Sequence, residues 1–154
     1  MPFVTLAVFF VLVVMVALTG MVFKPGDWYD GLAKPSWTPP DWSFRVVWSV
    51  LYPMIAVAGW LVWEAAGLTL ATAFWIAQLV LNGAWSWLFF GRWRMDQAFA
   101  DVVLLWLSIL GFIITAWSIS PLAALLFLPY LLWVTIAAAL NRAVWQLNPQ
   151  AMQG

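Results

Sequence analysis

Long apolar segments alternate with short polar ones along the whole chain. The segments predicted as helices cover residues 3–23, 43–65, 69–90, 97–118 and 122–147. About 20 apolar residues in a helix are enough to cross the hydrocarbon core of a bilayer, and each segment has roughly that length. The pattern predicts an all-α, polytopic membrane protein. We expect one domain over residues 1–154, built as a bundle of five transmembrane helices.

The longest polar segment, residues 24–42, separates the first two predicted helices. From Pro25 onward it reads PGDWYDGLAKPSWTPPDW, with four prolines, two glycines and several charged residues. Proline and glycine interrupt helices and favour turns. The segment is therefore predicted as a loop, and the other connections between helices are much shorter.

Composition agrees with a membrane protein and excludes several kinds of site. Hydrophobic residues make up 66% of the chain and charged residues 8%, whereas a soluble domain has about 25% charged residues. The formal net charge is zero, so the chain has no excess of positive charge that would attract nucleic acid. Cysteine and histidine are absent, which removes thiolate nucleophiles, Cys-based metal sites and the commonest general base. No metal site is expected.

The basic residues predict how the chain is oriented in the membrane. With five spans, all of them fall on or near one side: Lys24, Lys34, Arg45, Arg92, Arg94 and Arg142. Lysine and arginine in short loops stay in the cytoplasm. We therefore expect the 24–42 loop and the C-terminus to be cytoplasmic and the N-terminus to be non-cytoplasmic. A bacterial membrane is also expected.

Three predicted helices carry a stripe of aromatic, polar and small residues at helical spacing. The stripes are Gln78, Asn82, Trp85 and Phe89; Trp48, Tyr52, Ile55 and Gly59; and Tyr130, Trp133, Ala137 and Asn141. Residues at this spacing share one face of a helix. The stripes either line one ligand cavity or join the helices to one another, and spacing alone leaves both interpretations open.

Asp101 lies about one turn inside the fourth predicted helix, with Ser108 and Thr115 on the same face. A carboxylate within a membrane span suggests a function. Near a helix end, however, snorkelling or pairing with Arg92 or Arg94 explains it better, and we expect that outcome.

Four segments resemble the tryptophan-rich sensory protein family, whose animal members are called translocator protein or peripheral benzodiazepine receptor. They are WYDGLAKPSWTPPDW at 28–42, VVWSVLY at 46–52, LNGAWSWLFFG at 81–91 and LPYLLWVTIAAALN at 128–141. The segments occur in the order and at the spacing found in the family. The resemblance extends from the first helix to Leu147.

The resemblance implies a five-helix bundle, usually a homodimer, with a cavity covered by the first loop as a lid. It also implies ligands: porphyrins such as protoporphyrin IX, sterols, and synthetic isoquinoline carboxamides or benzodiazepines. Carried over position by position, the cavity residues are Trp48, Asn82, Trp85, Phe89, Trp133 and Ala137, with Tyr29, Trp37 and Pro40 in the lid. Tyr52 joins them from its stripe, and Lys34 of the lid is placed to meet a propionate.

Two features of the sequence narrow the expected ligands. Animal members have a tyrosine after the asparagine near the end of the fifth helix and a basic residue soon after, whereas Asn141 is followed here by Arg142 and then AVWQ. This argues against cholesterol binding. Without histidine or cysteine the usual axial ligands of haem are missing, so metal-free porphyrin is the expected partner, and no cofactor is required.

The favoured function is a membrane receptor or carrier for porphyrins and related planar apolar ligands, with a sensory, regulatory or transport role. The alternative is a light-dependent porphyrin-degrading enzyme in which Trp48 and Trp133 carry the chemistry. A proton-coupled transporter is weaker, since the sequence shows no inverted repeat. Ala73 and Ala77 form a small-xxx-small pair on the third helix, which predicts a homodimer through that helix.

Overall fold

The computed structural model describes residues 2–152 and is a bundle of five long helical segments. They are α1 (Pro2–Val22), α3 (Asp41–Ala66), α4 (Leu70–Ser86) with its π-helical continuation η1 (Trp87–Gly91), α5 (Met95–Ala116), and α6 (Pro121–Leu126) followed by α7 (Leu128–Leu147). Each of the five is long and apolar enough to cross a membrane. The predicted all-α, five-helix membrane bundle is confirmed.

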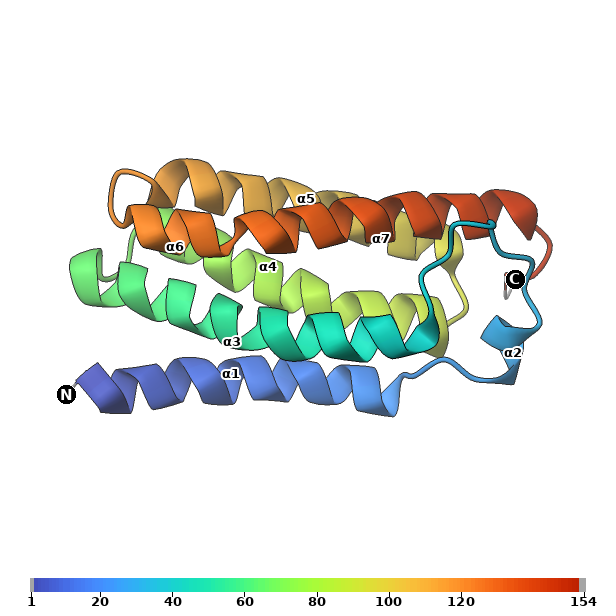
Figure 1. Cartoon of the computed structure of the whole chain (residues 1–154), viewed down its shortest axis with the longest axis horizontal. Coiled ribbons are helices and arrows are strands. Elements are labelled where there is room, and N and C mark those ends of the chain that lie inside the picture. Colours follow the sequence, from blue (N-terminus) through green and yellow to red (C-terminus); the bar gives the residue numbers. More distant parts are fainter. Residues whose placement is uncertain (1, 153–154) are drawn as a thin grey trace.

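Neighbouring helices in the bundle are arranged as a ring. Helix α1 packs on α3 and α4, α4 packs on α5, α5 on α7, and α3 on α6 (Figure 1). The loop after α1, the connection from α4 to α5 and the C-terminal end of α7 all lie at one end of the bundle, which we call the lid end. The N-terminus lies at the other. Within the loop, Asp27–Asp30 form a one-turn helix, α2. The last two residues of the predicted loop, Asp41 and Trp42, belong to α3.

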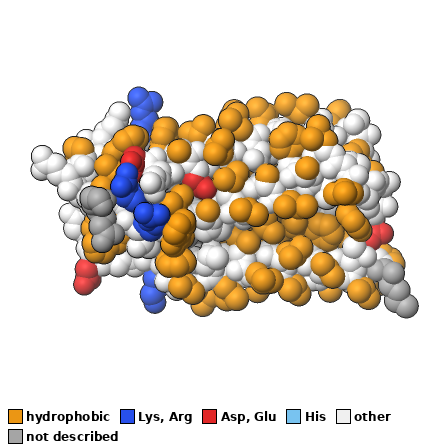
Figure 2. All heavy atoms as spheres, turned by 180° about the vertical axis from the view of Figure 1, so that it is seen from behind, with side chains coloured by type: hydrophobic (Ala, Val, Ile, Leu, Met, Phe, Trp, Pro, Cys, Tyr) orange, Lys and Arg blue, Asp and Glu red, His pale blue; other side chains and the backbone are white. Residues whose placement is uncertain are grey.

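The surface matches a protein surrounded by lipid. Hydrophobic side chains cover most of the face seen in Figure 2, and Lys and Arg side chains gather at the lid end. Helix α1 has only Phe9 and Val13 buried, although nearly all of its residues are apolar. In water this exposure would be unfavourable, but in a bilayer it is the expected state. The chain is an integral, multi-pass membrane protein.

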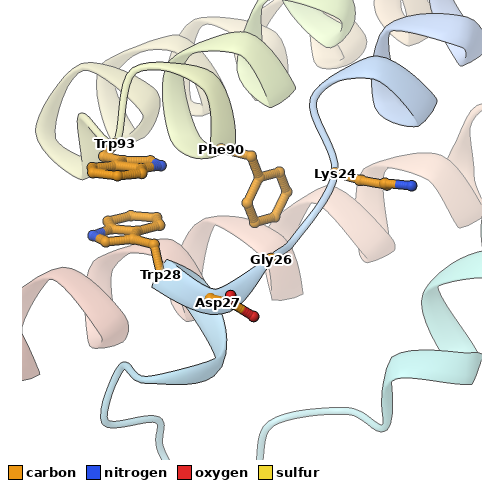
Figure 3. A pocket seen from close by; sticks show the side chains of 6 residues that line it. All are labelled: Lys24, Gly26, Asp27, Trp28, Phe90 and Trp93. Atoms are coloured by element: carbon orange, nitrogen blue, oxygen red, sulfur yellow. The ribbon is translucent and has the colours of Figure 1, made fainter.

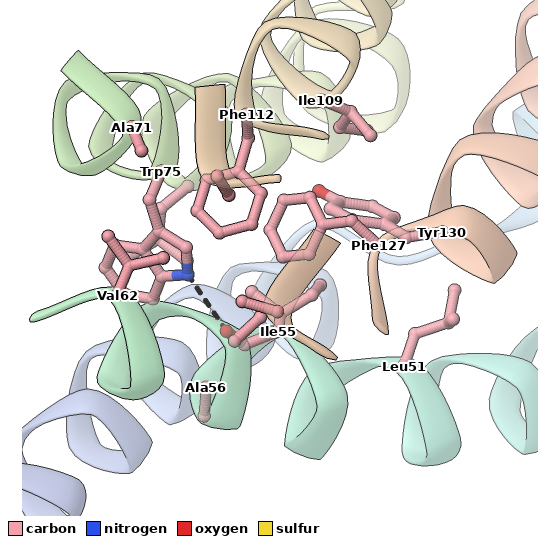
Figure 4. Packing of buried hydrophobic residues seen from close by; sticks show 14 of the residues in the cluster. Leu51, Ile55, Ala56, Val62, Ala71, Trp75, Ile109, Phe112, Phe127 and Tyr130 are labelled. Carbon is pink, nitrogen blue, oxygen red and sulfur yellow. Dashed lines mark hydrogen bonds between the residues drawn. The ribbon is translucent and has the colours of Figure 1, made fainter. Parts of the chain in front are cut away.

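The centre of the core is built around Trp75 of α4. Its ring is 2% exposed, and its indole N–H donates to the carbonyl of Ile55 on α3 at 2.9 Å (Figure 4). Gly59 makes this contact possible, because a Cβ at that position would lie only 2.5 Å from the Trp75 ring. The lack of a side chain at Gly59 therefore lets the Trp75 ring lie against the backbone of α3.

The last span differs from the continuous helix predicted over residues 122–147. It is interrupted at Phe127, where the backbone N–H donates to Ala124 three residues back instead of four. Pro129 explains the interruption: it has no N–H, and its ring clashes with the carbonyl four residues earlier. The break places Phe127 in the core, where its ring lies 4.1 Å from that of Phe112.

The connection from α4 to α5 is also irregular. After Ser86 the helix widens into the π-helical η1, and the N–H of Arg92 donates to the carbonyl of Trp87, five residues back, at 2.8 Å. Trp93 then has a φ of 57°, a left-handed conformation that non-glycine residues seldom adopt. Such features are common near functional sites. Here they direct the Trp93 ring toward the loop after α1.

Candidate ligand-binding site

A chain of hydrogen bonds connects three of the helices inside the bundle. The Tyr52 hydroxyl of α3 donates to Asn82 Oδ1 of α4 at 3.4 Å. Asn82 Nδ2 donates to the Tyr130 hydroxyl of α7 at 2.8 Å, and that hydroxyl donates to Gln78 Oε1 at 2.8 Å. Asn82 is thus already bonded when no ligand is present, as burial of an amide requires. All three predicted stripes face this interior.

Aromatic rings lie in the space between α3 and α7 near the lid end. Trp48 stacks on Tyr52, with centroids 5.0 Å apart, and meets Tyr130 edge-on at 6.1 Å. Phe44, at the start of α3, packs edge-on against Trp133 of α7 at 5.4 Å. The two tryptophans predicted to hold a ligand therefore lie on facing helices, each already in contact with another ring.

Trp133 differs from several other tryptophans within the spans. The indole N–H groups of Trp75, Trp85 and Trp106 each donate to an oxygen of the protein at 2.8–2.9 Å. Trp133 Nε1 is buried, and none of the described residues accepts its hydrogen bond. A buried donor without an acceptor costs about 1–3 kcal/mol, so this position favours a ligand that brings an oxygen or nitrogen acceptor.

A second aromatic group lies beneath the loop and contains three more of the predicted residues, Tyr29, Trp85 and Phe89. Phe89 stacks on Trp85 at 5.1 Å and meets Tyr29 of α2 edge-on at 6.0 Å. Trp85 also donates to Asn141 Oδ1 at 2.9 Å and packs against both hydrophobic clusters of the protein. Burial, assisted by the charges of Asp41 and Asp30, raises the pKa of the Tyr29 phenol, which therefore stays neutral under the loop.

Lys34 holds the loop in shape. Its ammonium donates to the carbonyls of Tyr29 and Leu32, at 2.8 and 3.2 Å, and lies 4.5 Å from the centre of the Tyr29 ring. An ammonium has three N–H donors, so one remains for an anion. Lys34 thus combines a structural role, which the sequence did not suggest, with capacity for one further contact.

The loop is fastened to the C-terminal end of α7. Asn148 accepts from the N–H of Ala33 at 3.0 Å and donates to the Ala33 carbonyl at 2.7 Å. Trp28 donates to the Ala151 carbonyl at 2.9 Å, and its ring is stacked on that of Trp93 at 5.4 Å. Together these contacts form a latch that joins the loop to two other segments of the lid end.

A hollow of about 540 Å³ lies beside this latch. In Figure 3 the parallel rings of Trp28 and Trp93 form one side of it and Phe90 stands on another, while the Lys24 side chain points away from the tryptophans. None of the residues predicted to bind a ligand lines this hollow. It opens at the outer edge of the loop, not between α3 and α7.

Three predicted residues take no part in these contacts. Trp37 is 50% exposed and Pro40 is exposed, and within residues 2–152 neither makes a ring contact or a side-chain hydrogen bond with the rest of the predicted site. Ala137 is half-buried, about one turn beyond Trp133 on α7. Phe44 was not among the residues predicted for the site, and Tyr130 was predicted only as part of a stripe.

The expectation that Asp101 snorkels or pairs with Arg92 or Arg94 is wrong. Arg94 pairs with Asp96 at 2.7 Å, and the guanidinium of Arg92 lies over the ring of Trp87 at 5.3 Å. Asp101 is 6% exposed, and no described residue is bonded to its Oδ2. Asp96, at the start of α5 and nearer to Arg94 in the sequence, forms the ion pair. The face of α5 that carries Asp101 is buried inside the bundle.

Comparison with known proteins identifies relatives over most of the chain. The model of the TspO/MBR family matches residues 5–146. Protein CrtK of Rhodobacter capsulatus is 44% identical over 93% of this chain and 92% of its own. The tryptophan-rich sensory protein of Cereibacter sphaeroides is 40% identical over 86% and 84%. The human translocator protein is 39% identical over 79% and 75%.

Proposed function

The chain belongs to the TspO/MBR family, and we propose that it is a membrane receptor or carrier for porphyrins, with protoporphyrin IX as the representative ligand. A sensory, regulatory or transport role would follow from that binding. The names of these relatives, tryptophan-rich sensory protein and translocator protein, support such a role. The observation that carries the proposal is the buried indole N–H of Trp133, which has no acceptor among residues 2–152.

The proposed site lies between α3 and α7, beneath the lid loop. A planar macrocycle enters by replacing the edge-on contact of Phe44 with Trp133, and it then stacks against Trp48 and Trp133. Ring stacking contributes about 0.5–1.5 kcal/mol beyond the burial of apolar area. An acceptor on the ligand satisfies the Trp133 N–H, and the free donor of Lys34 meets a propionate. Asn82 holds the floor of the site through Tyr52 and Tyr130.

A titration of purified protein tests the proposal, with tryptophan fluorescence quenching by protoporphyrin IX as the readout. Saturable one-site binding is expected, and its absence would overturn the proposal. Illumination of the complex distinguishes the binding protein from a porphyrin-degrading enzyme, because a binding protein returns the porphyrin intact. Loss of porphyrin with repeated turnover would support the enzyme instead, and loss of that turnover in Trp48→Ala or Trp133→Ala would assign it to these tryptophans.

Lys34→Ala is expected to weaken protoporphyrin binding about threefold to tenfold while leaving a neutral isoquinoline carboxamide nearly unaffected. Only the porphyrin has carboxylates to meet the ammonium, and one hydrogen bond to a charged group near the surface is worth about 1 kcal/mol. Isothermal titration with both ligands measures the difference. Equal losses for the two ligands would mean that Lys34 acts only by holding the carbonyls of Tyr29 and Leu32.

We also propose that the lid end faces the cytoplasm, because all six basic residues of the chain lie on or near that end. Reporter fusions at Gln150 and at Gly67 are expected to report opposite sides, with Gln150 cytoplasmic. Fusion activity of a phosphatase and of a fluorescent protein measures this directly. The reverse pattern would contradict the orientation.

A homodimer through α4 is a further part of the proposal. Ala73 is exposed on the outer face of α4 together with Ile76 and Val80, and Ala77 is half-buried. Small residues allow two backbones to approach closely. Ala73→Leu combined with Ala77→Leu is expected to convert a dimer to a monomer in detergent-corrected light scattering, and an unchanged dimer mass would place the interface elsewhere.

A further inference from the structure

A groove of about 410 Å³ runs along the outer surface of the bundle between α5 and α7, on the lipid-facing side and apart from the site proposed above. Phe99 and Trp106 of α5 line one wall, and Arg142 and Thr135 of α7 line the other. Ala138 and Ala139 lie between the latter two, and their small side chains leave the space open. The groove is therefore formed by one face of each helix, because the residues that line it recur at helical spacing along both.

One end of the groove carries a positive charge. Arg142 is exposed, and within residues 2–152 it has neither a hydrogen bond nor an ion pair. It lies five residues before the end of α7 at Leu147, or about 7.5 Å along the helix axis. From that depth a long side chain reaches the level of lipid headgroups. The guanidinium is thus available to an anion at the membrane boundary.

The other end of the groove is apolar and has no free polar atom. The indole N–H of Trp106 donates to Thr135 Oγ1 at 2.8 Å, and that hydroxyl donates to the carbonyl of Leu131 at 2.7 Å. These two bonds close the groove toward the middle of the membrane. From Arg142 to Thr135 the groove extends about 10 Å along α7, and over this length it offers only hydrocarbon contacts.

We propose that this groove binds an anionic phospholipid, with its phosphate on Arg142 and one acyl chain lying over Ala138 and Ala139 as far as the bond between Trp106 and Thr135. One cationic end and one apolar end match an amphiphile with a single anionic head. Guanidinium binds phosphate through two parallel hydrogen bonds. Basic pockets between transmembrane helices are known to favour anionic headgroups. A sterol would offer only a neutral hydroxyl and would leave the guanidinium without an anion.

Native mass spectrometry of the purified protein with dioleoylphosphatidylglycerol and dioleoylphosphatidylcholine tests this proposal. The parent protein is expected to retain phosphatidylglycerol at least tenfold more tightly than phosphatidylcholine. Arg142→Gln should remove that preference, and Arg142→Lys should restore part of it. Ala139→Phe fills the groove from an exposed position and should weaken binding of both lipids. Inorganic phosphate alone should not compete, since it lacks the acyl chain.

Two matched variants control for general effects of charge and bulk. Arg45→Gln removes an exposed arginine of α3, and Ala7→Phe adds the same ring to an exposed position of α1. Both should retain the parent's preference. Equal affinity of the parent for the two lipids, an unchanged preference in Arg142→Gln, or tighter binding of cholesterol than of phosphatidylglycerol would overturn the proposal. A dimer mass lost only in Ala139→Phe would also overturn it, by assigning the groove to a second copy of the chain.

Discussion

Trp133→Ala is expected to weaken protoporphyrin binding about 30-fold, a larger loss than any other single substitution in the proposed site. The substitution removes a stacking surface and the only buried indole N–H that has no acceptor among the described residues. Stacking and one hydrogen bond together amount to about 2 kcal/mol, which corresponds to roughly 30-fold in the dissociation constant. Trp48→Ala should cost less, because its ring lies against Tyr52 and Tyr130 on the inner side.

Two comparisons make this prediction specific. Trp117→Ala removes an exposed tryptophan far from the lid end and should bind protoporphyrin as tightly as the parent. Asn82→Ala should cost tenfold or less, because the Asn82 amide already has partners within the protein. Equilibrium titration of each folded variant, with circular dichroism as the check on folding, provides the measurement. Parent-like affinity in both Trp48→Ala and Trp133→Ala would place the ligand elsewhere.

Hydropathy predicted the spans closely because a membrane helix is determined by a local property. The predicted starts and ends of the first four segments lie within a few residues of those of α1, α3, α4 with η1, and α5. The bilayer requires about 20 apolar residues and satisfied backbone groups, and nothing more distant in the chain changes that requirement. The break at Phe127 also has a local cause, since Pro129 lies two residues later in the sequence.

The face that each helix presents was predictable as well, whereas its contacts were not. Spacing placed Asn82 and Trp133 on inward stripes, and both lie inside the bundle. Spacing does not tell which residue on another helix fills the space opposite a ring. Phe44 packs against Trp133 because the two rings meet across the space between α3 and α7. Arg94, one of the partners expected for Asp101, pairs instead with Asp96, five positions before it.

The latch was least predictable because it joins segments that are far apart in the sequence. Asn148 is separated from Ala33 by most of the chain, and nothing in either residue type predicts that the two form hydrogen bonds with each other. The left-handed conformation of Trp93, which brings its ring onto Trp28, likewise depends on the π-helical turn before it. Such long-range contacts depend on the assembled bundle, and a single sequence contains no local signal for them.

Asn148→Ala is expected to raise the dissociation rate of bound protoporphyrin about tenfold and to change the association rate less. The substitution removes both hydrogen bonds to Ala33, which fasten the lid loop to the end of α7. Two partly exposed hydrogen bonds contribute about 1–2 kcal/mol to closure, and a looser lid acts mainly on ligand exit. Stopped-flow fluorescence after dilution measures the rate. Trp28→Phe, which keeps a ring against Trp93 but loses the bond to Ala151, should give a smaller increase.

Gln146→Ala is the matched control, because it shortens an exposed polar side chain two residues away that makes no hydrogen bond in the described part of the chain. Its dissociation rate should equal that of the parent. Asn148→Asp keeps an acceptor for the Ala33 N–H but places a carboxylate against the Ala33 carbonyl, so it should also release ligand faster. If Asn148→Ala and Asn148→Asp both release protoporphyrin at the parent's rate, the contact with Ala33 does not hold the lid closed, and ligand leaves by a path that avoids the loop.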